Sequence, residues 1–95
     1  MRIFDLKVTF KCEIFAKDGM VKEAAVFERK RRAIRWAMSR VSARKFAIIT
    51  IYLEDSPEKK HINIKYHDVA AMMHNSGFEG AVDHYNAVLL GILGL

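Results

Sequence analysis

The sequence contains very little cysteine and proline, and each scarcity narrows the possible structures. Cys12 is the only cysteine among the 95 residues, so a disulfide within the chain is excluded. A single thiol is typical of proteins from reducing compartments, and we therefore expect a cytoplasmic location. The only proline, Pro57, lies in the charged segment Asp55–Lys60, which predicts a turn.

Long hydrophobic runs are absent as well. The longest one, Ala87–Leu95, is much shorter than the roughly 20 apolar residues that span a bilayer. Asp5, Lys7 and Lys11 interrupt any apolar stretch that could serve as the core of a signal peptide. We therefore expect no membrane partner.

Motifs that carry catalysis or hold metal are also missing. The sequence has no P-loop, no glycine-rich dinucleotide turn, no nucleophile elbow and no kinase pattern. The spacing of its four histidines matches no recognised metal site: His61, His67, His74 and His84. Cys12 falls on the inward face of a predicted strand, where a thiol is inert. We expect a protein that is not an enzyme and that holds no cofactor and no metal.

The composition is that of a folded globular protein. Hydrophobic residues make up 52% of the chain, and 95 residues suffice for one core but not for two. We expect a single α+β domain over residues 1–95.

The first half of this domain begins with strands. From Phe4 to Ile14, hydrophobic and polar residues alternate, which predicts a strand with one buried face. Asp18-Gly19 predicts a tight turn, and Met20–Phe27 a second strand. The alternative for the last segment is helix, which would give one long helix from about Met20 to Ala43.

Further along the chain the hydrophobic period changes twice. From about Arg29 to Arg44, Ile34, Met38 and Val41 recur at helical spacing, with Ala33 and Ala37 beside them. Two further strands are predicted at Phe46–Leu53 and His61–His67. A short helix is predicted at Asp68–Gly77, with Asp68 as its N-cap and Gly77 as its end, and a last helix at Glu79–Leu93. The order ββαββα predicts one antiparallel sheet with the helices on one face.

Positive charge is concentrated in the first predicted helix. The stretch from Arg29 to Lys45 holds eight of the sixteen Lys and Arg residues and no Asp or Glu. Since like charges at helical spacing repel one another, something outside the helix should compensate, either acidic groups of the same chain or a partner. The candidate binding residues are Arg29, Arg32, Arg35, Trp36, Arg40, Arg44 and Lys45.

Within this set, Arg32, Trp36 and Arg40 are spaced i, i+4, i+8 and form a ridge opposite Ile34. Arginine suits phosphate, and an indole ring can stack on an unpaired base, so we predict docking of nucleic acid, DNA or RNA. The structural interpretation of Trp36 is that it covers the rim of the core among solvated arginines.

The alternative function is a small inhibitor or adaptor that binds an acidic protein or nucleoprotein surface through the same residues, for example a host-defence nuclease. In size and in its lack of catalytic motifs the chain is similar to accessory proteins of phages and mobile elements. The resemblance concerns these general properties only, and no sequence motif supports it.

The C-terminal residues are apolar around the whole predicted helix. Leu90, Leu93 and Leu95 do not belong to its inward stripe. They predict either a homodimer interface or a tail that packs against the chain's own sheet or core.

Overall fold

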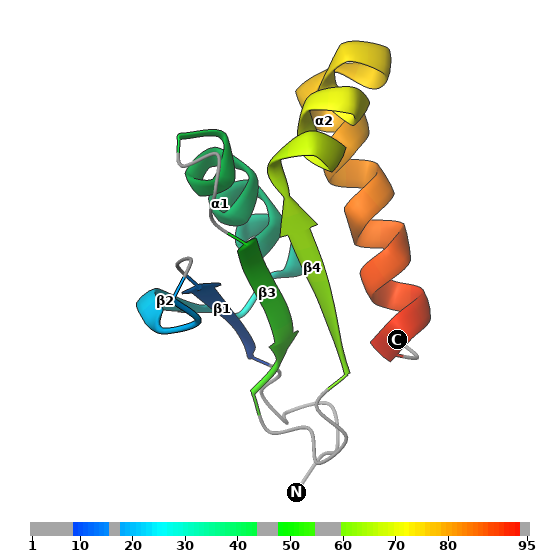
Figure 1. Cartoon of the computed structure of the whole chain (residues 1–95). Coiled ribbons are helices and arrows are strands. Elements are labelled where there is room, and N and C mark those ends of the chain that lie inside the picture. Colours follow the sequence, from blue (N-terminus) through cyan, green and yellow to red (C-terminus); the bar gives the residue numbers. More distant parts are fainter. Residues whose placement is uncertain (1–8, 16–17, 44–47, 55–59, 94–95) are drawn as a thin grey trace, which may run out of the picture.

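The computed structural model describes residues 9–15, 18–43, 48–54 and 60–93, except for the side chain of Leu93. Its elements follow the order ββαββα (Figure 1). They are β1 (Phe10–Phe15), β2 (Val21–Phe27), α1 (Lys30–Ala43), β3 (Ile48–Leu53), β4 (His61–Lys65) and α2 (Tyr66–Leu93). The strands form one sheet in the order β2-β1-β3-β4, and every neighbouring pair is antiparallel. The predicted α+β class and element order are confirmed.

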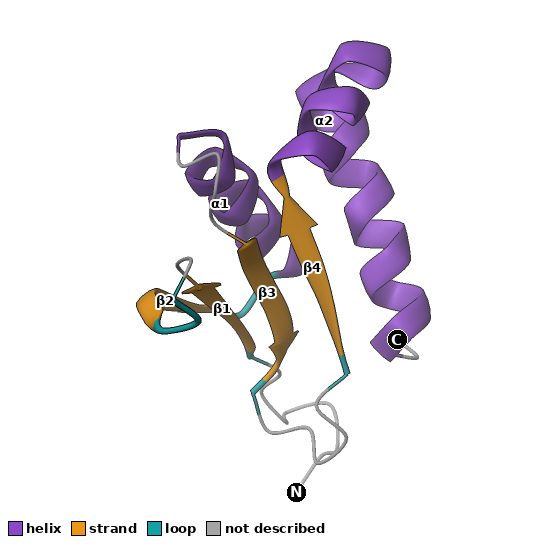
Figure 2. Ribbon diagram, in the orientation of Figure 1, coloured by secondary structure: helices purple, strands orange, loops and turns teal. Residues whose placement is uncertain are grey.

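Both helices cover the same face of the sheet (Figure 2). The reason is the alternation within the strands, which turns every second side chain toward the helices. In β1, Phe10, Cys12 and Ile14 are buried, and Ile49, Ile51, Ile62 and Ile64 are their counterparts on β3 and β4. The core lies between this face and the inward sides of α1 and α2.

The hairpin β1–β2 settles the strand-or-helix alternative for residues 20–27. Gly19 has a positive φ of 81°, and the carboxylate of Asp18 accepts a hydrogen bond from the backbone N–H of Met20 at 2.9 Å. This turn brings β2 back along β1, where Cys12 lies opposite Ala25. Residues 21–27 therefore form a strand.

The predicted strand boundaries need small corrections. Within the described residues, β1 begins at Phe10 rather than earlier and extends one residue beyond Ile14. β3 is described from Ile48 onward. Residues 4–8, 46–47 and 55–59 of the predicted strands and turn lie outside the described residues.

The junction between β4 and α2 differs from the prediction. The strand ends at Lys65 and the helix begins at Tyr66, so Asp68 lies in the first helical turn and is not the N-cap. The burial pattern explains the difference, because Tyr66 packs on the core and the next buried residue is Val69, three positions later. An aspartate in the first turn still suits the positive end of the helix dipole.

Gly77 interrupts α2, as its position in the sequence predicts. Its φ of 74° and ψ of 177° are not helical, and the chain changes direction there. The second arm, coloured orange to red in Figure 1, runs back along the sheet beside β4. The buried residues on its inner side include Val82, Tyr85 and Leu89. No helix in the described part of the chain is long and apolar enough to cross a membrane.

Candidate nucleic-acid interface

Helix α1 exposes its basic residues because its apolar residues occupy the opposite side. Ala33, Ile34, Ala37, Met38 and Val41 are all fully buried against the sheet and α2. The arginines between them must point along the flanks of the helix or away from the core. The inward face of the helix is thus as predicted.

Three of these arginines form ion pairs with acidic residues of the same chain. Arg31 pairs with Asp83 at 2.6 Å and Arg35 with Glu79 at 2.8 Å, and both acids lie on the second arm of α2. The third pair joins Arg40 to Glu23 of β2 at 3.3 Å. Internal acids therefore supply part of the compensation that the one-signed stretch requires.

Arg35 shows the strength of this pairing most clearly. Its Nη2 atom donates hydrogen bonds to both carboxylate oxygens of Glu79, at 3.2 and 2.8 Å. The hydrogen bonds, and then the charge of Glu79, raise the pKa of the Arg35 guanidinium above its usual value. Arg35 is thus less available to an external anion than its sequence position suggests.

Trp36 lies at the rim of the core and is partly buried. Its ring lies 5.9 Å from that of Phe27, tilted by 54°, and the guanidinium carbon of Arg40 lies 5.3 Å above the indole centroid. Arg40 and Trp36 of the predicted ridge are therefore adjacent, but the arginine occupies a face of the ring that a base would need.

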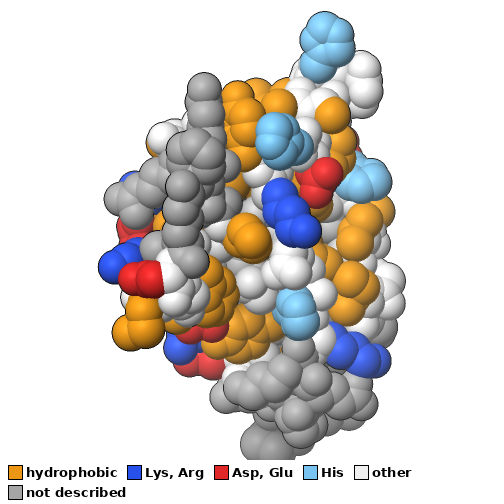
Figure 3. Space-filling model, viewed as in Figure 1, with side chains coloured by type: hydrophobic (Ala, Val, Ile, Leu, Met, Phe, Trp, Pro, Cys, Tyr) orange, Lys and Arg blue, Asp and Glu red, His pale blue; other side chains and the backbone are white. Residues whose placement is uncertain are grey.

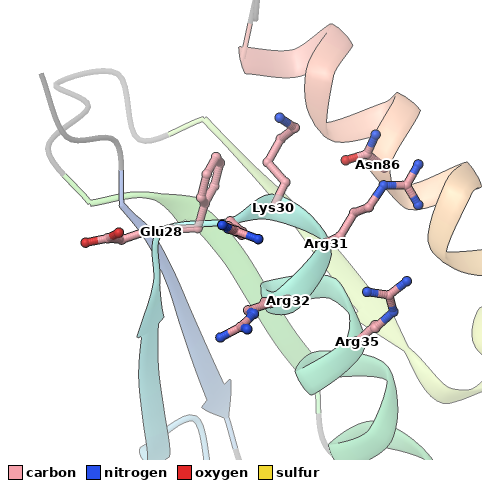
Figure 4. A pocket seen from close by; sticks show the side chains of 8 residues that line it. Glu28, Lys30, Arg31, Arg32, Arg35 and Asn86 are labelled. Atoms are coloured by element: carbon pink, nitrogen blue, oxygen red, sulfur yellow. The ribbon is translucent and has the colours of Figure 1, made fainter. Parts of the chain in front are cut away.

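The remaining cations gather where β2 ends and α1 begins. Arg29, Lys30 and Arg32 form no ion pair with any described residue, and we refer to them as the free cation cluster. A hollow of about 750 Å³ lies beside them. It is lined by Phe10, Glu28, Arg29, Lys30, Arg31, Arg32, Arg35 and Asn86. Figure 4 shows these side chains around the start of α1, with Asn86 on the facing arm of α2.

A second hollow of about 370 Å³ shares three residues with the first. Glu28, Arg29 and Arg32 line both, and Val26 and Phe27 complete the second. Val26 is half exposed. Two members of the free cation cluster, Arg29 and Arg32, thus border both hollows.

The backbone adds to the positive potential of this surface. The first N–H groups of a helix have no partner within it and carry the positive end of its dipole. The first turn of α1 contains no acidic residue that could neutralise this end. Among the described residues that line the hollows, Glu28, directly before the helix, is the one that carries a carboxylate.

On the face seen in Figure 3, Lys and Arg side chains are few and are separated by hydrophobic and histidine side chains.

The described residues contain no group of three or more His, Cys, Asp or Glu that could hold a metal ion. Burial raises the pKa of the Cys12 thiol to about 12, as expected for an inert thiol.

Several predicted residues remain without a structural account. Arg44, Lys45 and Leu95 lie outside the described residues, as does the side chain of Leu93. Leu90 is half-buried. Conversely, sequence reasoning did not select Lys30 or the wall residues Glu28 and Asn86, although the concentration of charge at residues 29–32 indicated this end of the helix.

Comparison with known proteins adds nothing to this geometry. No family model, curated protein or solved structure matches the chain. A function must therefore be inferred from the surface alone.

Proposed function

We propose that this protein is a non-catalytic binding protein that docks on the phosphates of nucleic acid through the start of α1. One observation carries the proposal: Arg29, Lys30 and Arg32 have no ion-pair partner among the described residues and border a hollow. Three neighbouring cations that form no ion pair with any described residue repel one another, and an anion relieves that repulsion.

The chemistry of the surface suits phosphate in particular. Guanidinium groups bind phosphate oxygens through paired N–H donors, and an ammonium group binds them as a point charge. Unpaired N–H groups at a helix start add further donors. Because none of these contacts reads a base edge, the proposed binding is independent of base sequence.

The proposal places the binding surface at the N-terminal end of the helix. Arg32 belongs to the predicted ridge and also to the free cation cluster, whereas Arg40 is held by Glu23 and by Trp36. Arg35 contributes to the wall of the first hollow but is paired with Glu79. We therefore assign the main role to Arg29, Lys30 and Arg32.

Fluorescence anisotropy with labelled DNA and RNA oligonucleotides tests the proposal. The variant Arg29→Glu/Arg32→Glu should lower the affinity at least about tenfold, since it reverses two phosphate contacts. The matched control, Lys22→Glu/Lys65→Glu, changes the net charge equally on exposed strand positions away from the hollows and should bind almost normally. Equal loss in both variants, or no binding by the wild type at low salt, contradicts the proposal.

A cytoplasmic location and a homodimer through the C-terminal helix complete the proposal. Val88 and Met73 of α2 are exposed hydrophobic residues, and Leu90 is half-buried. Sedimentation equilibrium should show a dimer that Val88→Glu weakens. If the wild type stays monomeric at high concentration, the proposed dimer is wrong.

A further inference from the structure

Strand β2 forms one edge of the sheet, and no strand among the described residues pairs with its outer side (Figure 1). Every second residue of an edge strand directs its backbone N–H and C=O groups outward, where they can pair with another chain. Lysine, proline and bulges usually prevent such pairing. β2 contains no proline, and both its one lysine, Lys22, and its irregular register with β1 lie at its beginning. Residues 23–27 therefore present a regular edge.

The residues of β2 stay accessible on both faces of the sheet. None of them is fully buried, whereas every second residue of β1 is. Glu23, Ala25 and Phe27 lie on the helix side and are half-buried. Ala24 and Val26 lie on the opposite, open face and are exposed. A strand added beside β2 could therefore place side chains against this protein on both faces.

The ridge of α1 runs along the helix side of this edge. Arg40 pairs with Glu23 near the beginning of β2. Trp36 packs against Phe27, and Arg32 lines the second hollow at the end of the strand. Figure 4 shows Arg32 on the side of α1 that faces β2. All three residues of the ridge thus lie beside the edge strand.

Positive charge is left without an ion pair at the end of β2. Arg29 and Arg32 line the second hollow and form no ion pair with any described residue. Guanidinium groups bind carboxylates through paired N–H donors. An acidic side chain on the helix side of an added strand therefore suits this end of the edge.

We propose that a partner protein adds an extended segment to the outer edge of β2 as a further strand. Acidic side chains of this segment lie on the helix side, at Arg29 and Arg32, and its apolar side chains lie on the open face beside Ala24 and Val26. Backbone hydrogen bonds then provide affinity, and the alternating side chains provide specificity. The proposal stands apart from the docking of nucleic acid, although Arg29 and Arg32 serve both.

The charge beside the edge favours this partner over a second copy of the chain. When two identical edge strands pair around a two-fold axis, the helices of both copies lie on the same side of the joined sheet. The two ridges, each with Arg32 and Arg40, would then approach each other with charge of the same sign. An acidic segment meets attraction instead.

Nuclear magnetic resonance of the isotope-labelled wild type tests the proposal. The probe is a synthetic peptide of about eight residues, within the usual length of a strand, that alternates valine with threonine or glutamate and contains two glutamates. The peptide should shift the backbone amide signals of β2 and slow the hydrogen exchange of its outward amides. Unchanged signals and exchange in β2 overturn the proposal.

Altered peptides separate strand addition from attraction between charges. A strand directs alternate N–H groups to opposite edges, so we methylate either one set or the other. One methylated peptide should bind at least about tenfold more weakly than the parent, because it lacks the donors that face β2, and the other should bind nearly as well. Lysine in place of both glutamates should abolish binding. Equal binding by the parent and both methylated peptides overturns the proposal, because charge alone then explains the affinity.

Ala24→Asp tests where the segment lies on this protein. Ala24 and Asn63 belong to one row across the open face, at opposite edges of the sheet. Ala24→Asp places a carboxylate beside the apolar side chains of the peptide and should weaken binding about fivefold or more. The control, Asn63→Asp, makes the same change in charge on β4 and should bind normally. Equal affinities of the two variants contradict binding at β2.

Concentrated protein without peptide provides the last arm of the experiment. Fast exchange of the outward amides of β2 is expected in this sample, because the acidic segment is missing. If these amides are already protected in the concentrated protein alone, a second copy occupies the edge and the proposal is wrong.

Discussion

The guanidinium group of Arg40 lies over the indole ring of Trp36, 5.3 Å from its centroid. The same guanidinium pairs with Glu23 of β2. Arg40 is thus engaged on two sides within the chain. Arg40 differs in this respect from Arg29 and Arg32, which form no ion pair with any described residue.

The substitution Arg40→Ala should therefore affect Trp36 more than binding. Trp36 is the only tryptophan of the chain, so its fluorescence reports on this position alone. Without the guanidinium, acrylamide should quench Trp36 more strongly, while the affinity for nucleic acid stays nearly unchanged. A loss of affinity as large as that of Arg32→Ala would show that the whole ridge binds, as the sequence suggested.

Removing an internal carboxylate should strengthen binding. Glu79→Gln leaves a neutral partner for Arg35, so the charge of Arg35 becomes available at the first hollow. For a single strand, one additional phosphate contact should steepen the plot of log affinity against log salt by about 0.7. Isothermal titration at several salt concentrations measures this change.

The control for this prediction is Glu54→Gln, which changes the net charge equally at an exposed residue that lines neither hollow. It should leave the salt dependence as in the wild type. If both variants gain the same affinity, net charge alone is responsible and the pairing of Arg35 with Glu79 has no role.

The sequence predicts which side of α1 is buried but not which arginines form ion pairs with other described residues. Periodicity places Ile34, Met38 and Val41 inward, because burial follows directly from the helical repeat. The ion pairs, in contrast, join residues that lie 52 and 44 positions apart, Arg31 with Asp83 and Arg35 with Glu79. They depend on how the second arm of α2 packs beside α1, which no local pattern contains.

The boundary between β4 and α2 shows the same limit on a smaller scale. Alternation from His61 onward continues through Tyr66, because Tyr66 is half-buried as the first residue of the helix just as it would be in a strand. Only Val69, buried three positions later, reveals the change of period. Because Asp68 could cap a helix, the predicted boundary between strand and helix lies two residues too far along the chain.

Gly77 should be essential to the shape of α2. Its φ of 74° and ψ of 177° lie in a region that is almost closed to other residues, although a Cβ there would meet no atom within 4 Å. We expect Gly77→Ala to lower the free energy of unfolding by about 1–3 kcal/mol, entirely through backbone strain. Urea denaturation followed by circular dichroism measures this change.

Gly91 offers a matched control for that substitution. A Cβ at Gly91 would also meet no atom within 4 Å, but the φ of this residue is not in the positive range. Gly91→Ala should therefore raise stability by up to about 1 kcal/mol, as expected for a helical glycine. Similar losses of stability in both variants would mean that the positive φ at Gly77 is not the cause of the loss.

Stability should fall at alkaline pH through the buried thiol of Cys12. Burial raises the pKa of Cys12 from 9.0 to about 12, so the unfolded chain loses this proton at lower pH than the folded chain does. The free energy of unfolding should therefore decrease as the pH rises from about 9 toward 12. Burial, and then the charge of Asp68, likewise raise the pKa of Tyr85 from 10.0 to about 12, which adds a second decrease at higher pH.

The variant Cys12→Ala separates these two contributions. Between pH 9 and 10 its free energy of unfolding should change less with pH than that of the wild type, whereas above pH 10 the tyrosine contribution should remain. Urea titrations at fixed pH values give both curves. Parallel curves for the two proteins between pH 9 and 10 would contradict burial of the thiol in its neutral form.

The central claim is that three cations at the start of α1, Arg29, Lys30 and Arg32, bind phosphates of nucleic acid. The most direct test is the salt dependence of binding for the wild type and for Arg29→Gln/Arg32→Gln. With three phosphate contacts, the slope of log affinity against log salt should be about −2 for a single strand, and the variant should reduce it by about two thirds. Binding that does not change with salt, or a slope that the variant leaves intact, would contradict the account.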